Sequence, residues 1–104
     1  MMENELFRYD TMQLIWAKLE TYRKIRIKQA EIIELEQKIK EKENKTWLTA
    51  NFKEAGCTTD KLRGAYVKDT VKEDTNKLDW LKFDLDKFYD DLHLINDLLE
   101  VKRG

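Results

Sequence analysis

The sequence predicts an all-α fold: a long antiparallel helical hairpin with coiled-coil-like packing and a short connector helix, packed as an oligomeric helical bundle. Three observations lead to this prediction. The 104 residues include no proline and three glycines, so long helices can run without a forced break. A ladder of apolar residues with alternating three- and four-residue steps occupies the C-terminal half. Charged residues make up 39% of the chain beside 41% hydrophobic ones, which is typical of charged faces around a narrow apolar seam. The length fits a single domain, 1–104.

The first helix is expected over about residues 4–43. Asp10 and Gln13 have the spacing of a capping box, so the residues before them can form a separate turn. Two apolar stripes follow, the first made of Met12, Ile15, Leu19 and Tyr22, and the second of Ile25, Ile32, Leu35 and Ile39. Two successive three-residue steps join the stripes, which predicts a local overwinding, a stammer. This helix should pack less regularly than the second.

A connector is expected over about residues 44–58, with a short helix of its own. Asn44 or Thr46 can cap this helix, and Gly56 is well placed to end it. A compact connector between two helices of similar length favours an antiparallel pair.

The second long helix is expected over about residues 59–102. Thr59 can cap its first turn. The apolar ladder of this helix consists of Leu78, Leu81, Leu85, Phe88, Leu92, Ile95 and Leu99. It extends upstream through Val71 and Val67, with Asp74 as the polar exception. Burying each large apolar side chain contributes about 1.5–3 kcal/mol, which favours an inward-facing seam.

Charge supports the antiparallel arrangement. Residues 18–28 are mainly basic and residues 84–100 are mainly acidic, and an antiparallel hairpin brings the two segments alongside each other. Opposite charges flanking a seam help to set orientation and register. Intramolecular pairing is therefore the main interpretation of the basic cluster, and a nucleic-acid contact through Arg23, Lys24 and Arg26 is the alternative.

Several apolar residues fall off the seam and predict a second packing layer. On the second helix these residues are Trp80, Phe83, Leu94, Leu98 and Val101, and on the first they are Leu14, Trp16, Ile27 and Ile33. A two-helix hairpin buries one face of each helix, so a second apolar face indicates a homo-oligomer, with a dimer favoured. Alternatively, long side chains of the partner helix or the connector cover these residues.

The connector region also carries a candidate contact for a protein partner. Trp47, Phe52 and Tyr66 lie near Lys61 and Arg63, and aromatic anchors beside basic residues are typical of binding hot spots. Packing of these aromatic residues against the end of the hairpin is the alternative. A helix-turn-helix over residues 46–67 is a further interpretation.

Candidate chemistry is sparse, and we expect no catalytic, cofactor-binding or metal-binding residues. Asp90 and His93 are one helical turn apart, but a metal-binding bundle needs such a pair twice together with further carboxylates. Cys57 has no neighbouring candidate base that would make it a nucleophile. The sequence therefore predicts a protein that is not an enzyme and has no cofactor.

Net charge, the single cysteine and the lack of a long apolar segment argue against nonspecific nucleic-acid binding and against membrane association. The net charge of −1 is too small for nonspecific attraction to nucleic acid or anionic membrane. A lone cysteine favours the cytosol, and the N-terminus lacks the pattern of a signal peptide. No stretch has the roughly 18 apolar residues of a membrane span. We expect a cytoplasmic protein without membrane contact.

The segments 47–56 (WLTANFKEAG) and 59–67 (TDKLRGAYV), followed by a long acidic helix, resemble small helical accessory proteins of phages of Gram-positive bacteria. Such proteins are often encoded among early replication or recombination genes. The resemblance covers about the last two-thirds of the chain and implies a phage-derived protein of the host cytoplasm that binds and modulates a host or phage enzyme. It transfers no catalytic residue.

Together these features predict a non-enzymatic helical protein that acts by contact with an unidentified protein partner. A nucleic-acid-binding accessory protein of replication or recombination is the first alternative. A virion assembly chaperone is the second.

Overall fold

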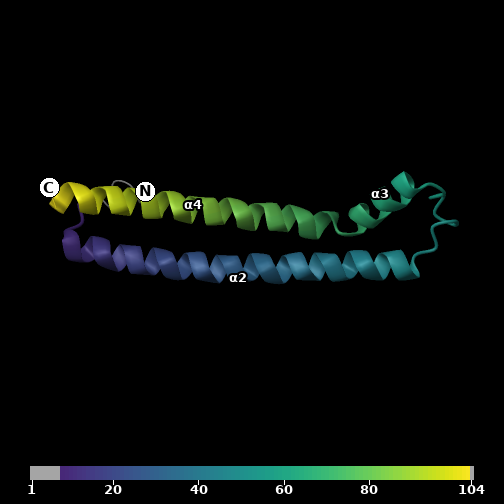
Figure 1. Ribbon diagram of the computed structural model, residues 1–104, viewed down its shortest axis with the longest axis horizontal. Helices are drawn as coiled ribbons and strands as arrows, with labels where there is room; N and C mark the ends of the chain where they lie inside the picture. Colours follow the sequence, from purple (N-terminus) through teal and green to yellow (C-terminus); the bar gives the residue numbers. More distant parts are fainter. Residues whose placement is uncertain (1–7, 104) are drawn as a thin grey trace. The chain divides into compact units, whose positions relative to one another are not determined.

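The chain folds as an all-α helical hairpin, as the sequence predicts. The structure, a computed structural model, describes residues 8–103, and these contain α2 (Thr11–Thr49), α3 (Asp60–Thr70) and α4 (Lys72–Arg103) and no strand (Figure 1). The fold has two compact units. The terminal unit pairs the start of α2, up to Ala30, with the end of α4, from Lys82 onward, and the connector unit comprises Glu31–Leu81. In each unit the returning chain runs antiparallel to α2.

The predicted capping box is confirmed at the start of α2. The Asp10 backbone N–H donates to Gln13 Oε1 at 2.9 Å, and the Gln13 backbone N–H donates to Asp10 Oδ1 at 2.8 Å. These reciprocal bonds satisfy two amide groups that a helix start would otherwise leave without acceptors. The part of the expected first helix near residue 4 lies outside the described residues.

The first helix is longer than predicted, and the expected helix within residues 44–58 is wrong. α2 continues to Thr49 because no proline or glycine interrupts it. The hydroxyls of Thr46 and Thr49 donate to the carbonyls of Lys42 and Lys45 at 2.9 and 2.8 Å, so these threonines lie within α2 and do not cap a new helix.

The connector forms only one helical turn. Asn51 Oδ1 accepts a hydrogen bond from the Glu54 N–H at 3.2 Å, which starts the turn. The turn ends at Gly56, whose φ of 76° is the left-handed conformation, and the Cys57 N–H reaches back to the Phe52 carbonyl at 2.8 Å. This is the Schellman pattern of a helix end. Gly56 thus terminates a turn as predicted, and the short helix of the hairpin is α3.

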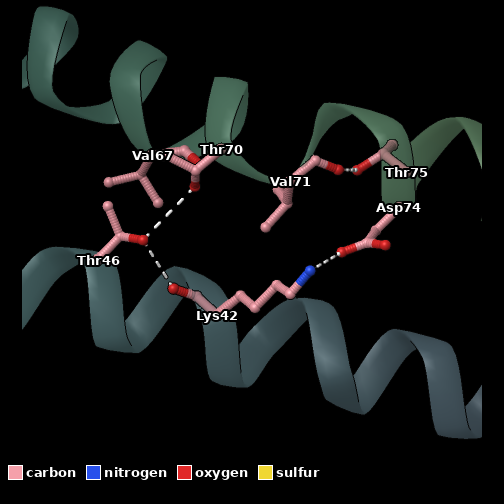
Figure 2. Close-up of polar contacts among 7 residues, drawn as sticks. All are labelled: Lys42, Thr46, Val67, Thr70, Val71, Asp74 and Thr75. Carbon is pink, nitrogen blue, oxygen red and sulfur yellow. Dashed lines mark hydrogen bonds and ion pairs between the residues drawn. The ribbon is translucent and has the colours of Figure 1, made fainter.

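The single helix predicted over residues 59–102 is two helices. Thr59 is the N-cap of α3, as predicted, and its hydroxyl accepts from the Leu62 N–H at 3.2 Å. The helix then breaks at Val71, where φ is −112° and ψ is 13°. Thr70 Oγ1 donates to the Val67 carbonyl at 2.6 Å, and Thr75 Oγ1 donates to the Val71 carbonyl at 2.9 Å; these residues are drawn in Figure 2. Threonine hydroxyls that bond to backbone carbonyls can bend helices, and two of them flank this break.

The apolar ladder of the second half faces inward, as predicted. Its seven members are all buried or half-buried, and Val67 and Val71 extend it further within the connector unit, with exposed fractions of 1% and 3%. In the terminal unit the ladder meets Leu14, which is fully buried in a cluster with Ile95, Leu98 and Leu99.

The seam of α2 differs from the predicted stripe. Leu14, Thr21 and Ile25 are buried in the terminal unit, whereas the first predicted stripe lies exposed, namely Met12, Ile15, Leu19 and Tyr22. The predicted Ile32, Leu35 and Ile39 are buried in the connector unit. From Leu14 to Ile39 the inward positions alternate four- and three-residue steps when Lys18 and Lys28, both half-buried, are included. The predicted stammer is therefore wrong.

Polar residues such as Thr21 and Lys28 can occupy this seam because the polar group of each one has a bonding partner. The Thr21 hydroxyl, in a residue only 3% exposed, donates to the Ala17 carbonyl at 2.8 Å. Lys28 extends its stem along the seam and places its Nζ 3.9 Å from Asp84 Oδ2. A seam that looks too polar in the sequence is thus compatible with burial.

Candidate protein-contact surfaces

The aromatic and basic residues predicted as a partner contact converge in the connector unit, with the exception of Lys61. The Phe52 ring lies between two others: its centroid is 5.4 Å from that of Trp47 and 5.7 Å from that of Tyr66, the latter edge-on. The Arg63 guanidinium lies 5.8 Å from the centre of the Phe52 ring. We call Trp47, Phe52, Arg63 and Tyr66 the aromatic cluster.

Three separate elements position this cluster. Trp47 belongs to the last turn of α2, Phe52 to the single connector turn, and Tyr66 to α3. Arg63 Nε donates to the Cys57 carbonyl at 3.4 Å, and its Nη1 lies 3.9 Å from Asp60 Oδ1. These contacts orient the guanidinium over Phe52. The sequence could suggest these residues by type, but only the Gly56 turn brings them together.

Much of the aromatic cluster remains accessible. Phe52 is half-buried, while Trp47 is 45% and Tyr66 is 37% exposed. Two leucines of the same unit are also exposed, Leu48 at 86% and Leu62 at 47%. Lys61 is exposed on the first turn of α3. The connector unit therefore presents aromatic rings in mutual contact beside a guanidinium group.

The helix-turn-helix interpretation of residues 46–67 is wrong. Residues 50–59 separate α2 from α3, whereas a helix-turn-helix has a turn of about 3–4 residues. The connector uses its extra length to place Phe52 between Trp47 and Tyr66.

The residues predicted as an oligomer interface on the second helix do not behave alike. Trp80, Phe83 and Val101 are exposed, by 68%, 50% and 75%. Leu98, however, is only 9% exposed and belongs to the core of the terminal unit, and Leu94 packs against that core. Leu98 and Leu94 are thus core residues and not part of an exposed interface, because the end of α4 buries a wider face than a single ladder.

A row of exposed apolar residues lies on α2 in the terminal unit. We define the outer ladder as Met12, Ile15, Leu19 and Tyr22, which are exposed by 63%, 42%, 57% and 43%. Trp16 lies beside it and is 67% exposed. This ladder is the first stripe that the sequence predicts for the intramolecular seam. Burial of Leu14 and Thr21 instead directs the ladder outward.

The candidate nucleic-acid residues lie at the end of the outer ladder. Arg23 and Arg26 are exposed, Lys24 is half-buried, and Arg23 lies 3.9 Å from Glu20. Arg23 and Arg26 border an open hollow of about 570 Å³ whose other walls are apolar, formed by Leu19, Tyr22 and Ile27. An apolar hollow with two guanidinium groups differs from the continuous basic face that phosphate backbones require.

Pairing of the basic and acidic segments is present in the terminal unit. In addition to the contact between Lys28 and Asp84, Gln29 Nε2 donates to the Tyr89 hydroxyl at 2.8 Å. Both contacts join α2 to α4, as the predicted antiparallel register requires.

Asp74, the polar exception in the seam, has a specific partner. Lys42 Nζ donates to Asp74 Oδ2 at 2.6 Å (Figure 2). This hydrogen bond lowers the pKa of the Asp74 carboxyl, and the positive charges of Lys42, Lys38 and Lys77 lower it further. Above Lys42, the Thr46 and Thr70 hydroxyls are 3.5 Å apart. A polar layer therefore joins α2 to the α3–α4 junction.

Residues 8–103 contain no group of three or more His, Cys, Asp or Glu side chains placed to hold a metal ion. Asp90 and His93 are exposed on α4, and Cys57 is half-buried with its Sγ 3.8 Å from the Ala55 carbonyl oxygen.

No helix within residues 8–103 combines the length and hydrophobicity needed to cross a bilayer.

Comparisons with known proteins find no matching family model, no matching curated protein and no matching solved structure. The geometry of the chain itself therefore has to support any functional conclusion.

Proposed function

We propose that this protein is a non-enzymatic helical module that acts by binding another protein through the aromatic cluster of its connector unit. The observation that carries the proposal is the convergence of Trp47, Phe52, Tyr66 and Arg63 from three elements into one accessible group. Binding energy at protein interfaces is concentrated in Trp, Tyr and Arg residues of this kind.

The contacts within the cluster support a binding role. Phe52 holds Trp47 and Tyr66 by ring contacts, and Arg63 is anchored on the Cys57 carbonyl. Side chains that are already ordered lose less conformational entropy on binding, which costs about 0.5–1.5 kcal/mol for each mobile side chain that must be immobilised. The partner that fits is a protein surface with an apolar pocket for Trp47 or Tyr66 and a carboxylate for Arg63.

The test is quantitative binding by the full-length chain. Wild-type protein, Trp47→Ala and Tyr66→Ala are immobilised and exposed to an extract of the source cell, and any retained protein is then purified and its Kd measured against each chain. We expect each substitution to raise the Kd by about 30-fold, the equivalent of 2 kcal/mol at a hot spot.

Ile33→Ala is the matched control. Ile33 is 64% exposed in the same unit but lies on α2 outside the aromatic cluster, so its substitution should leave the Kd unchanged. Far-UV circular dichroism verifies that each variant keeps its helices. A partner whose affinity is the same for wild type, Trp47→Ala and Tyr66→Ala contradicts the proposal, as does retention of nucleic acid alone.

A further inference from the structure

α2 has a row of exposed apolar residues outside its buried seam in the terminal unit. Leu14, which is fully buried, and Thr21, which is 3% exposed, face the core. The outer ladder lies roughly 120° around the helix from this buried row, since each residue advances about 100° around an axis with 3.6 residues per turn. Exposed apolar residues scattered singly are ordinary on protein surfaces, but an aligned row marks an interaction site.

The spacing of the outer ladder fits another helix packed against it. Met12, Ile15, Leu19 and Tyr22 are separated by three, four and three residues, the spacing with which coiled-coil seams interlock. This order of steps is the same in both directions along the chain. In an antiparallel pair of α2 helices, each ladder residue therefore faces a ladder residue of the second copy: Met12 lies opposite Tyr22, and Ile15 lies opposite Leu19.

We propose that the chain forms a two-fold symmetric dimer in which the outer ladder of α2 packs antiparallel against the same ladder of a second copy. The four layers are Met12–Tyr22, Ile15–Leu19 and their two symmetry equivalents, and none contains a charged side chain. Such a contact is isologous, so it closes on itself and leaves no complementary surface for further growth. It is independent of the aromatic cluster, which lies in the other unit.

A contact between Arg23 and Asp10 at each end of the ladder favours this register. Arg23, which follows Tyr22, comes alongside Thr11 of the second copy and close to its Asp10, and symmetry repeats the contact. Asp10 is exposed, and its Oδ1 accepts from the Gln13 N–H of the capping box, so Oδ2 is the atom that faces Arg23. Arg26 comes alongside Arg8 one layer further out, where both are exposed and solvent screens their repulsion.

The available area is adequate for a specific dimer. From the exposed fractions of Trp16 and the outer ladder, the apolar surface that can be covered is roughly 550 Å² on each copy, given the usual size of such side chains. Two copies together would bury roughly 1,100 Å², which exceeds the value of about 1,000 Å² expected of a biological interface.

The first experiment is sedimentation equilibrium of the full chain at micromolar concentration. We expect twice the 12.6 kDa mass of one chain, and Leu19→Glu should return the mass to that of one chain by raising the dissociation constant at least 100-fold. Leu48→Glu is the matched control, because Leu48 is more exposed than Leu19, at 86%, and lies in the connector unit. It should remain a dimer. A monomeric wild type, or a Leu19→Glu variant as dimeric as Leu48→Glu, overturns the proposal.

A second experiment tests the register without introducing charge. In a Cys57→Ser background, chains carrying Ile15→Cys are mixed with chains carrying Leu19→Cys and oxidised. The antiparallel register predicts mostly mixed cross-linked pairs, because Ile15 lies opposite Leu19 of the second copy. Predominant self-pairing of each variant would indicate a parallel contact and overturn the proposal, and so would a lack of cross-linking in the mixture.

Discussion

Leu14→Ala is the most direct test of which face of α2 packs in the terminal unit. Leu14 is fully buried against Ile95, Leu98 and Leu99. Removing three buried carbon atoms forfeits roughly 2.4 kcal/mol at about 0.8 kcal/mol for each. The cavity that remains raises the expected loss in the free energy of unfolding to about 3 kcal/mol. With an m-value of about 2 kcal/mol per molar urea, the unfolding midpoint should fall by about 1.5 M, as measured by far-UV circular dichroism.

Leu19→Ala is the matched control, since Leu19 is 57% exposed on the outer ladder. At high dilution, where association no longer contributes, this substitution should change the unfolding free energy by no more than about 0.5 kcal/mol. The cost of Leu14→Ala should be independent of concentration, whereas any cost of Leu19→Ala should grow with concentration because association stabilises the folded chain. If Leu19→Ala costs more than Leu14→Ala at high dilution, the outer ladder faces α4 and the assignment of faces is wrong.

Two further predictions concern the connector unit. Gly56→Ala should destabilise it by about 1–2 kcal/mol because φ is 76° at this position. Gly64→Ala should instead stabilise it by about 0.5–1 kcal/mol, because Gly64 lies within α3 and has open space at its Cβ position. Thermal unfolding of both variants measures the two changes, and changes of the same sign would contradict the helix boundaries. The lowered pKa of Asp74 means that its bond with Lys42 stabilises the fold above the ordinary pKa of 3.8 and that this contribution is lost as the pH falls through the lowered value. Urea midpoints measured from pH 6 down to about pH 2 should therefore show the advantage of wild type over Asp74→Asn disappearing at the acidic end, and a constant difference would exclude the ion pair as its source.

The second half of the hairpin was predictable because its ladder is unambiguous. Leucines, Phe88 and Ile95 recur at three- and four-residue steps, and no competing row on that helix is as apolar. α2 carries two ladders, and the more hydrophobic one, from Met12 to Tyr22, is the one that lies exposed. Periodicity identifies the rows on a helix, but it does not say which row meets the neighbouring helix when polar residues can be accommodated in a seam.

Some helix ends could likewise be predicted from the sequence, whereas others could not. The caps at Asp10 and Thr59 depend on side chains within three residues of the amide groups they satisfy, and both were predicted. The break at Val71 is flanked by two threonine hydroxyls that bond to backbone carbonyls. Threonine is common within helices, so its presence alone does not reveal a break.

The candidate contact residues were likewise identified by type and assembled by the fold. Trp47, Phe52 and Tyr66 are aromatic residues in a region of turns, which is visible in the sequence, but their ring contacts depend on the connector path set by Gly56. Leu98, predicted to be exposed, is buried because the end of α4 packs on Leu14 through more than one row.

The sequence by itself determined the helices, their antiparallel return and the inward face of the second one, because these follow from local hydrogen bonding, the absence of proline and a regular apolar period. Only the tertiary structure decided which ladder of α2 is buried, where Lys28 and Asp74 find their partners, and that four side chains of the connector unit form one surface. These outcomes depend on contacts between residues far apart in the chain, and such contacts form only when the helices pack against each other.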